Sequence, residues 1–95
     1  MTSPIAVEPA GDHEYMVRIA TDTSTVESRF TVDPAVLGEL GLADPDETQV
    51  VHHTAAFLTQ QQPVDDFPPL VYLEDVIAAY EDYPEYIRSN IEPAG

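Results

Sequence analysis

The sequence predicts an α+β fold in which an N-terminal antiparallel β-hairpin packs against three or four short helices. Three patterns predict it. Apolar and polar residues alternate over residues 14–32, apolar residues recur at helical spacing after residue 34, and Asp-Pro pairs precede two of the helical stretches. We expect a single domain over residues 13–91, a flexible tail over residues 1–12 and a frayed end over residues 92–95.

The hairpin is predicted by a period of two on both sides of a turn signal, Asp22-Thr23-Ser24. The apolar positions are Tyr15, Val17, Ile19, Val26, Phe30 and Val32. A register that pairs Arg18 with Glu27 keeps these positions on one face, because an odd shift would turn them toward water. Two strands alone are marginally stable, so helices or a second chain must cover the apolar face, and the hairpin edge offers a route to a homodimer.

Two short motifs mark helix starts. Asp33 can cap a helix that has Pro34 at its first position, and Gly41 can take the left-handed conformation that ends it. Residues 44–47, Asp-Pro-Asp-Glu, predict a second helix with a capping-box-like start in which the first Asp is the cap, and Pro63 ends this helix. Its inward stripe is Val50, Val51, Thr54, Phe57, Leu58 and Gln61 or Gln62.

After a proline-rich connector over residues 64–69, helical spacing predicts a third helix over about residues 70–81. Pro84 disfavours α geometry at Tyr83, so we expect a break there, followed by a last short helix. The inward positions are Leu73, Val76, Ile77 and Tyr80 in the third helix, and Tyr86 or Ile87 with Ile91 in the last. The predicted core contains Tyr15, Val17, Ile19, Phe30, Leu37, Leu40, Phe57, Leu58 and Ile77.

Acidity is the largest departure from an average composition. The chain has 18 Asp and Glu residues, three arginines (Arg18, Arg29 and Arg88) and no lysine, so its formal net charge is −15. This charge repels polyanions, so we expect neither direct nucleic-acid binding nor membrane binding, whereas a basic protein remains a suitable partner. The absence of cysteine, of a signal-peptide pattern and of a long apolar run predicts a soluble, cytoplasmic protein.

No catalytic or metal site can be assembled from the sequence, so we expect no enzyme activity, no cofactor and no bound metal. His52 and His53 are adjacent on a predicted helix and point about 100° apart, so they cannot share a cation as an i, i+4 pair could. The paired carboxylates at residues 65–66, 74–75 and 81–82 are expected in a loop or on polar faces, where burial does not raise a pKa for acid–base work.

One constellation suits a binding face, because tyrosine supplies rigid amphipathic contact area and carboxylates steer basic partners. The candidate partner-binding residues are Tyr72, Glu74, Asp75, Glu81, Asp82, Tyr83 and Glu85. Tyr83 is the expected anchor, because Pro84 should hold its ring out of the helix. The alternative is that two or three of the tyrosines in this segment are core-boundary residues with wet hydroxyl groups.

The stretch over residues 57–87, FLTQQQPVDDFPPLVYLEDVIAAYEDYPEYI, resembles a family of short, acidic prokaryotic proteins of uncharacterised function. The shared pattern is a hairpin, a short helix ending in LGL, a helix ending in FL-x-x-x-x-P, and an end like V-I-x-x-Y-x-x-Y-P-x-Y. The resemblance covers about residues 14–91 and implies a packing pattern, so it assigns no functional residue. Gln60, Gln61 and Gln62 stand where the pattern leads us to expect a more charged segment.

Three interpretations of the acidity compete. The first is a non-enzymatic protein-binding or regulatory module that engages a basic partner through the C-terminal half. The second is a DNA mimic that occupies the groove of a nucleic-acid-binding protein, which requires carboxylates spaced like phosphates. The third is a housekeeping domain of a halophile, in which acidity is a solubility adaptation and concentrated salt screens self-repulsion. The third best explains acids spread from Glu8 to Glu92, and the first is the functional hypothesis.

Overall fold

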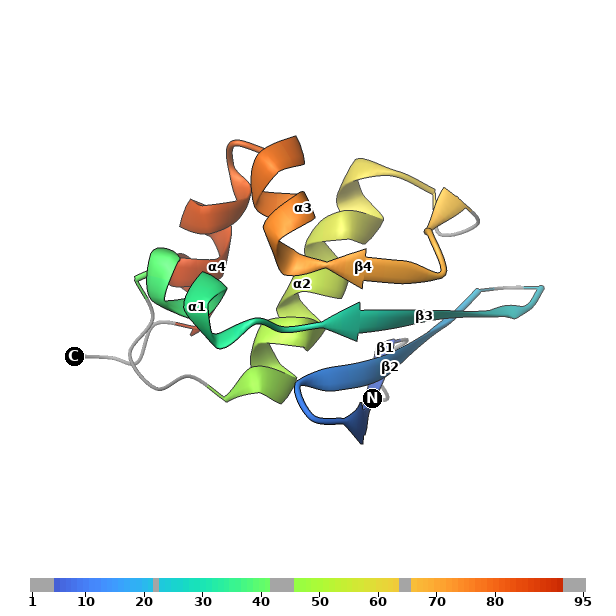
Figure 1. The fold of residues 1–95 in the computed structure, drawn as a ribbon. Coiled ribbons are helices and arrows are strands. Elements are labelled where there is room, and N and C mark those ends of the chain that lie inside the picture. The colour runs from blue at the N-terminus through green and yellow to red at the C-terminus, as the bar shows by residue number, and fades with distance from the viewer. Residues whose placement is uncertain (1–4, 22, 42–45, 64–65, 92–95) are drawn as a thin grey trace.

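The computed structural model describes residues 5–21, 23–41, 46–63 and 66–91. The strands in these ranges are β1 (Ile5–Gly11), β2 (Glu14–Ala20), β3 (Thr25–Thr31) and β4 (Leu70–Tyr72), and the helices are α1 (Pro34–Glu39), α2 (Glu47–Gln61), α3 (Leu73–Ala79) and α4 (Tyr83–Ile91). The strands form one sheet in the order β1-β2-β3-β4, with helices packed on it (Figure 1). The predicted α+β class, with an antiparallel hairpin against short helices, is therefore confirmed.

The predicted hairpin is the β2–β3 pair, which is antiparallel and has Arg18 opposite Glu27 as predicted. Val17, Ile19 and Phe30 are buried on the face that the helices cover. Tyr15, predicted to be buried, is half-buried and packs against the edge of the core. The alternation of apolar residues was sufficient to set this register, because a shift by one residue would expose the whole apolar set.

The expectation of a flexible tail over residues 1–12 is wrong for residues 5–11, which form β1 and pair with β2. The strand was missed because Pro9 and Gly11 interrupt its short alternation, and the register shifts between these two residues. A proline and an irregular register are tolerated at the edge of a sheet, where one side of the strand needs no partner. Residues 1–4 and 92–95 lie outside the described part of the chain.

The predicted third helix is in fact a strand followed by a helix. Residues 70–72 form β4, which pairs in parallel with β3, and α3 starts at Leu73. Pro68 and Pro69 just before it favour an extended backbone, and β3 supplies the partner that a local pattern cannot show. β1 pairs along β2, and β4 pairs with residues 29–31 of β3, so both strands of the hairpin have a neighbour in the sheet. The homodimer route through the hairpin edge stays a prediction.

The start of α1 agrees with the sequence. Asp33 is the N-cap, and its Oδ1 accepts a hydrogen bond from the Ala35 N–H at 2.9 Å. Pro34 occupies the first helical position, and Gly41 after the helix has a φ of +79°, in the left-handed region. A side chain at Gly41 would be strained in that conformation, so glycine is required there.

The start of α2 differs from the sequence prediction. The N-cap is Asp46, whose Oδ1 accepts from the Thr48 N–H at 2.9 Å, whereas Asp44 and Pro45 lie outside the described residues. The predicted capping-box partner of Glu47, Asp44, lies outside the described residues, and the Glu47 carboxylate is engaged by side chains from β2 and from the turn before it. Sequence alone could not choose between two aspartates that both suit an N-cap.

The core lies between the sheet and the helices. Helix α2 packs across β1 and β2 on one side and against α4 on the other, while α3 contacts β4 and α4. The buried hydrophobic residues include seven of the nine predicted ones, Val17, Ile19, Phe30, Leu37, Leu40, Phe57 and Leu58, whereas Ile77 and Tyr15 are half-buried. In the last helix Ile87 is buried and Tyr86 half-buried, and the side chain of Ile91 lies outside the described part of the structure.

Candidate binding face

Strand β4 carries two apolar side chains that are open to solvent. Leu70 is 42% exposed and Tyr72 is 40% exposed, and they are the exposed large hydrophobic residues of the described chain. Val71 between them is buried, as expected when successive side chains of a strand point to opposite faces. The end of the sheet therefore presents apolar surface next to the start of α3.

A hollow of about 140 Å³ lies beside β4. Its lining combines Leu70 and Tyr72 with residues of α3 and of the C-terminal part of α2. Leu58, Val71 and Val76 are the buried hydrophobic residues of the lining, and Asp75 is its carboxylate. The hollow is thus apolar at its base with a negative charge at its rim.

A second, more polar hollow of about 450 Å³ adjoins the first. It lies between the end of α2, the end of α3 and the turn that follows, and its carboxylates are Glu81 and Asp82. Ala79 and Tyr80 line both hollows, so the two are neighbours on one surface. We call this surface the groove face and define it by Leu70, Tyr72, Asp75, Tyr80, Glu81 and Asp82.

The structure brings together four of the seven candidate partner-binding residues predicted from the sequence. Tyr72 and Asp75 line the first hollow, and Glu81 and Asp82 line the second. Glu74 and Glu85 are exposed in the first turns of α3 and α4 without lining either hollow. Tyr80 also belongs to the face, although its spacing assigned it to the inward side of the third helix, and it is half-buried. Leu70 was not predicted for the face, because its exposure shows only once β4 is placed at the end of the sheet.

Tyr83 is not part of this face, and the expectation that Pro84 would hold its ring outside the helix is wrong. Tyr83 is the first residue of α4 and is fully buried. Proline is tolerated in the first turn of a helix, where an N–H group has no intrahelical acceptor, so Pro84 does not force a break at Tyr83. The break lies earlier, between Ala79 and Tyr83, where α3 ends and α4 begins.

The buried Tyr83 has a polar partner and an aromatic one. Its hydroxyl lies 2.6 Å from Thr54 Oγ1, which itself donates to the Val50 carbonyl oxygen at 2.7 Å. Because the Thr54 hydrogen is used in that way, Tyr83 donates to Thr54. Burial raises the pKa of Tyr83 to about 12. Phe57 packs against the ring with centroids 5.4 Å apart.

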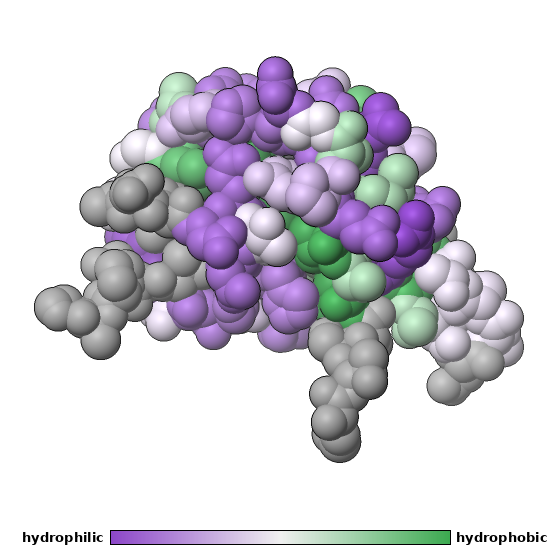
Figure 2. Space-filling view, turned by 90° about the horizontal axis from the view of Figure 1, so that it is seen from below, coloured by the Kyte–Doolittle hydropathy of each residue, from purple (hydrophilic) through white to green (hydrophobic). Residues whose placement is uncertain are grey.

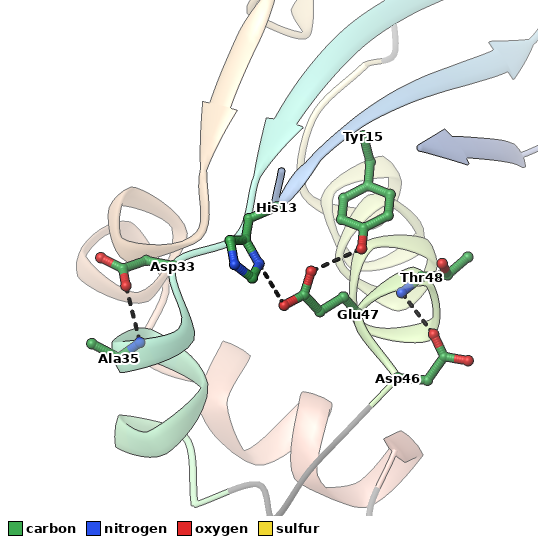
Figure 3. Close-up of polar contacts among 7 residues, drawn as sticks. All are labelled: His13, Tyr15, Asp33, Ala35, Asp46, Glu47 and Thr48. Carbon is green, nitrogen blue, oxygen red and sulfur yellow. Dashed lines mark hydrogen bonds and ion pairs between the residues drawn. The ribbon is translucent and has the colours of Figure 1, made fainter. Parts of the chain in front are cut away.

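A polar cluster at the opposite part of the sheet joins β2 to the start of α2 (Figure 3). Glu47 lies between two side chains: Tyr15 donates its hydroxyl to Oε1 and His13 Nδ1 meets Oε2, each at 2.8 Å. Burial raises the pKa of Tyr15 to about 12, and the hydrogen bond and charge of Glu47 add to the rise. Both oxygens of the Glu47 carboxylate are hydrogen-bonded, and the Tyr15 hydroxyl stays protonated at neutral pH. The cluster therefore connects β2 to the start of α2 and supplies no nucleophile.

The turn between β1 and β2, which carries His13 of this cluster, has an unusual backbone conformation. His13 has a φ of +59°, a value that non-glycine residues seldom adopt. Its carbonyl oxygen accepts from the Val32 N–H at 2.8 Å, which ties the turn to the end of the hairpin. No sequence pattern indicated this cluster, because Glu47 lies 34 positions after His13 and 32 positions after Tyr15 in the chain.

The adjacent histidines make an edge-on contact, with ring centroids 5.6 Å apart and planes at 85°. Burial lowers the pKa of His53, and the neighbouring His52 lowers it further. Among the residues that the structure describes, no group of three or more His, Asp or Glu side chains is placed to hold a metal ion. None of the helices in these ranges has the length and apolar character needed to cross a membrane.

Charges are distributed unevenly over the surface. Arg18 lies between Glu8 and Glu27 on the sheet at 2.8 Å from each, and Arg29 lies 3.8 Å from Glu14. Within the described ranges, no ion pair is found for the carboxylates of the groove face. A view from below shows a largely hydrophilic surface with hydrophobic residues gathered near its middle (Figure 2). The carboxylates of the sheet strands are therefore paired with arginines. Those of the groove face have no such partner among the described residues.

Comparison of the chain with protein-family models, with curated protein sequences and with solved structures finds no match.

Proposed function

We propose that the chain is a small non-enzymatic protein-binding module that engages a basic partner protein through the groove face. The observation that carries the proposal is the position of the two exposed hydrophobic residues, Leu70 and Tyr72, beside a hollow with a carboxylate at its rim. Interfaces gain affinity from a few aromatic or aliphatic anchors in well-packed pockets, surrounded by a polar rim. The groove face has this arrangement.

The charges of the face support a basic partner. Asp75, Glu81 and Asp82 have no arginine beside them in the described structure, in contrast to Glu8 and Glu27 on the sheet. The chain as a whole has a net charge of −15, so a cationic partner is attracted from a distance and an anionic one is repelled. Steering of this kind raises the association rate more than it lowers the dissociation rate.

In this proposal Tyr72 is the aromatic residue that anchors the partner. Tyr83, the anchor expected from the sequence, is buried and contributes to the fold instead. Tyr72 is an exposed tyrosine at the end of β4, and the half-buried Tyr80 lines both hollows. The proposed division of work is that Tyr72 and Leu70 hold the partner while the carboxylates speed its approach.

Capture from a lysate of the source cells at their native ionic strength tests the proposal, with the full chain immobilised. Tyr72→Ala is expected to weaken retention of the partner mainly through faster dissociation, and the double variant Glu81→Gln/Asp82→Asn mainly through slower association. The matched control is Asp12→Asn/Glu39→Gln, which removes the same charge from two exposed carboxylates outside the groove face. Equal retention by all variants contradicts the proposal.

The two other interpretations of the acidity predict different outcomes of the same experiment. A DNA mimic would lose its partner to added duplex DNA, and the control variant would weaken capture as much as the groove variant, because mimicry uses carboxylates over a whole face. A domain whose acidity is only a salt adaptation would retain no partner that depends on Tyr72. Selective sensitivity to the groove variants, without competition by DNA, supports the binding module.

A further inference from the structure

The free edge of β4 faces away from β3. The two strands are parallel with Phe30 opposite Val71, and the Arg29 N–H donates to the Pro69 carbonyl oxygen at 2.9 Å. In a parallel ladder each residue directs both its N–H and its C=O to the same side, and successive residues alternate. Pro69 and Val71 therefore face β3, whereas both backbone groups of Leu70 and the N–H of Tyr72 face outward, where the strand order ends. The Tyr72 carbonyl group belongs to the start of α3, because Tyr72 is the N-cap of that helix.

The two edges of the sheet differ in how they are protected. At the opposite edge, β1 contains Pro9 and an irregular register, two features that discourage pairing with another strand. β4 has neither within its three residues, and the prolines at positions 68 and 69 precede it. Among the described residues no strand pairs with the outer edge of β4, which is short and has outward N–H groups on Leu70 and Tyr72.

The apolar hollow lies beside this edge. Its lining contains all three residues of β4 together with Asp75, Val76 and other residues of the adjoining helices. The hollow has a volume of about 140 Å³ and a lining that is mostly apolar, so it has room for an apolar side chain. A strand added to β4 would direct alternate side chains toward this hollow, so backbone pairing and apolar contact can occur together.

We infer that the groove face takes its partner as an extended segment of alternating apolar and basic residues, which adds to the sheet along the outer edge of β4. The inference rests on the proposed function and specifies the way in which that partner is held. Apolar residues of the segment enter the hollow, and basic residues meet Asp75 and the carboxylates of the second hollow. A second copy of this chain is disfavoured as the occupant, because each copy carries a net charge of −15.

The test uses a synthetic probe and the full-length chain. The probe is an eight-residue peptide of alternating arginine and valine with blocked termini, and its control is the same composition as a block of four arginines followed by four valines. Hydrogen exchange of single backbone amides is followed by NMR with and without saturating peptide at about 0.15 M salt, where long-range attraction is largely screened. We expect the alternating peptide to slow exchange of the Leu70 and Tyr72 amides several-fold. The Val71 and Leu73 amides, which the register already pairs with β3, should change little.

A pair of variants examines the backbone contribution separately. Leu70→Pro removes one outward N–H together with the side chain, and Leu70→Ala removes the side chain alone. We expect Leu70→Pro to raise the Kd for the alternating peptide about five-fold more than Leu70→Ala, as the loss of one hydrogen bond predicts. If Leu70→Pro does not fold, the amide exchange of the unmodified chain decides the question.

The outcomes separate this inference from the proposed function. Protection of the Leu70 and Tyr72 amides by the alternating peptide supports strand addition. Binding of the peptide without that protection, or equal binding of the block peptide, overturns strand addition and leaves a basic partner of another shape. Absence of binding by the alternating peptide also overturns it, while the lysate capture and its variants decide the proposed function independently.

Discussion

Tyr72 and Tyr83 belong to one short acidic segment, yet they have opposite roles in the structure. Tyr72 is 40% exposed at the end of β4, whereas Tyr83 is 0% exposed and hydrogen-bonded to Thr54 between α2 and α4. Both were candidates for the same binding face. The difference shows that local composition identifies residues able to bind a partner, while the packing of helices decides which of them remain on the surface.

The largest expected effect is the difference in the free energy of unfolding between Tyr83→Ala and Tyr72→Ala. Tyr83→Ala removes a fully buried ring that packs against Phe57, and we expect it to lower the free energy of unfolding by about 3–5 kcal/mol. Tyr72→Ala should change it by less than about 0.5 kcal/mol, as is usual at exposed positions. Urea denaturation of both variants measures the difference. Similar midpoints for the two variants would show that the comparison is wrong.

Alkaline pH should unfold the domain through the buried tyrosine. The pKa of Tyr83 is raised to about 12 in the folded chain, against about 10 for an unfolded one. The contribution of this group to stability is therefore complete below pH 10 and is lost as the pH rises from 10 through 12. The rise in the pKa from 10 to about 12 corresponds to a contribution of at most about 2–3 kcal/mol to the free energy of unfolding.

Melting temperatures measured at intervals between pH 8 and pH 12 test this expectation. Tyr83→Phe should flatten the alkaline decline, and Tyr15→Phe should flatten it in part, because the pKa of Tyr15 is raised to about 12 as well. Tyr72→Phe is the control and should leave the decline unchanged. An unaltered decline in Tyr83→Phe would show that another group controls alkaline unfolding.

Loss of the Tyr83 hydroxyl alone should have a smaller effect. In Tyr83→Phe, Thr54 loses a donor but still donates to the Val50 carbonyl oxygen, so no buried hydrogen-bond donor is left unpaired. We expect the free energy of unfolding at pH 7 to fall by about 1 kcal/mol. Thr54→Val, which removes the acceptor and leaves the Tyr83 hydroxyl unpaired in the core, should cost more. The reverse order would mean that Tyr83 does not donate to Thr54.

The smallest expected effect concerns the open carboxylates near Tyr72. Glu81→Gln/Asp82→Asn should raise the melting temperature slightly in dilute buffer, because it reduces repulsion in a chain with a net charge of −15. The gain should vanish in molar KCl, where the Debye length is about 3 Å. By contrast, Arg18→Gln should lower the melting temperature in dilute buffer, because it leaves Glu8 and Glu27 facing each other unpaired.

Thermal melts of the parent and these variants in dilute buffer and in KCl test the charge argument, and the parent is itself expected to gain stability with salt. Salt can also stabilise the fold by strengthening the burial of apolar surface. A potassium salt without this action, used at equal ionic strength, separates charge screening from stronger apolar burial. A parent that melts at the same temperature in all of these conditions would contradict self-repulsion and remove the support for a salt adaptation.

Where the sequence prediction succeeded, local chemistry was decisive. The register of Arg18 with Glu27 followed from alternation, and Asp33 and Gly41 were placed correctly because a cap and a left-handed residue each have few suitable side chains. The sequence also singled out four residues that line the two hollows of the groove face, Tyr72, Asp75, Glu81 and Asp82, and their part in binding stays a prediction.

Where it failed, the deciding partner was distant in the chain. β1 and β4 are strands because β2 and β3 offer them hydrogen bonds, and neither has an alternation strong enough to be recognised from the sequence alone. Glu47 looked like part of a cap until His13 and Tyr15 were placed beside its carboxylate. For the same reason Leu70 was assigned to a helix, and its place at an open edge was missed.

The sequence by itself therefore determined the fold class, the hairpin register, most of the core and the acidity of the chain. These properties depend on periodicity and on the preferences of single residues, which act over a few positions. Only the tertiary structure decided that Tyr83 is buried, that Tyr72 borders a hollow and that β4 ends the sheet. The physical reason is that exposure is the surface left after all elements have packed, so it depends on contacts between residues far apart in the chain.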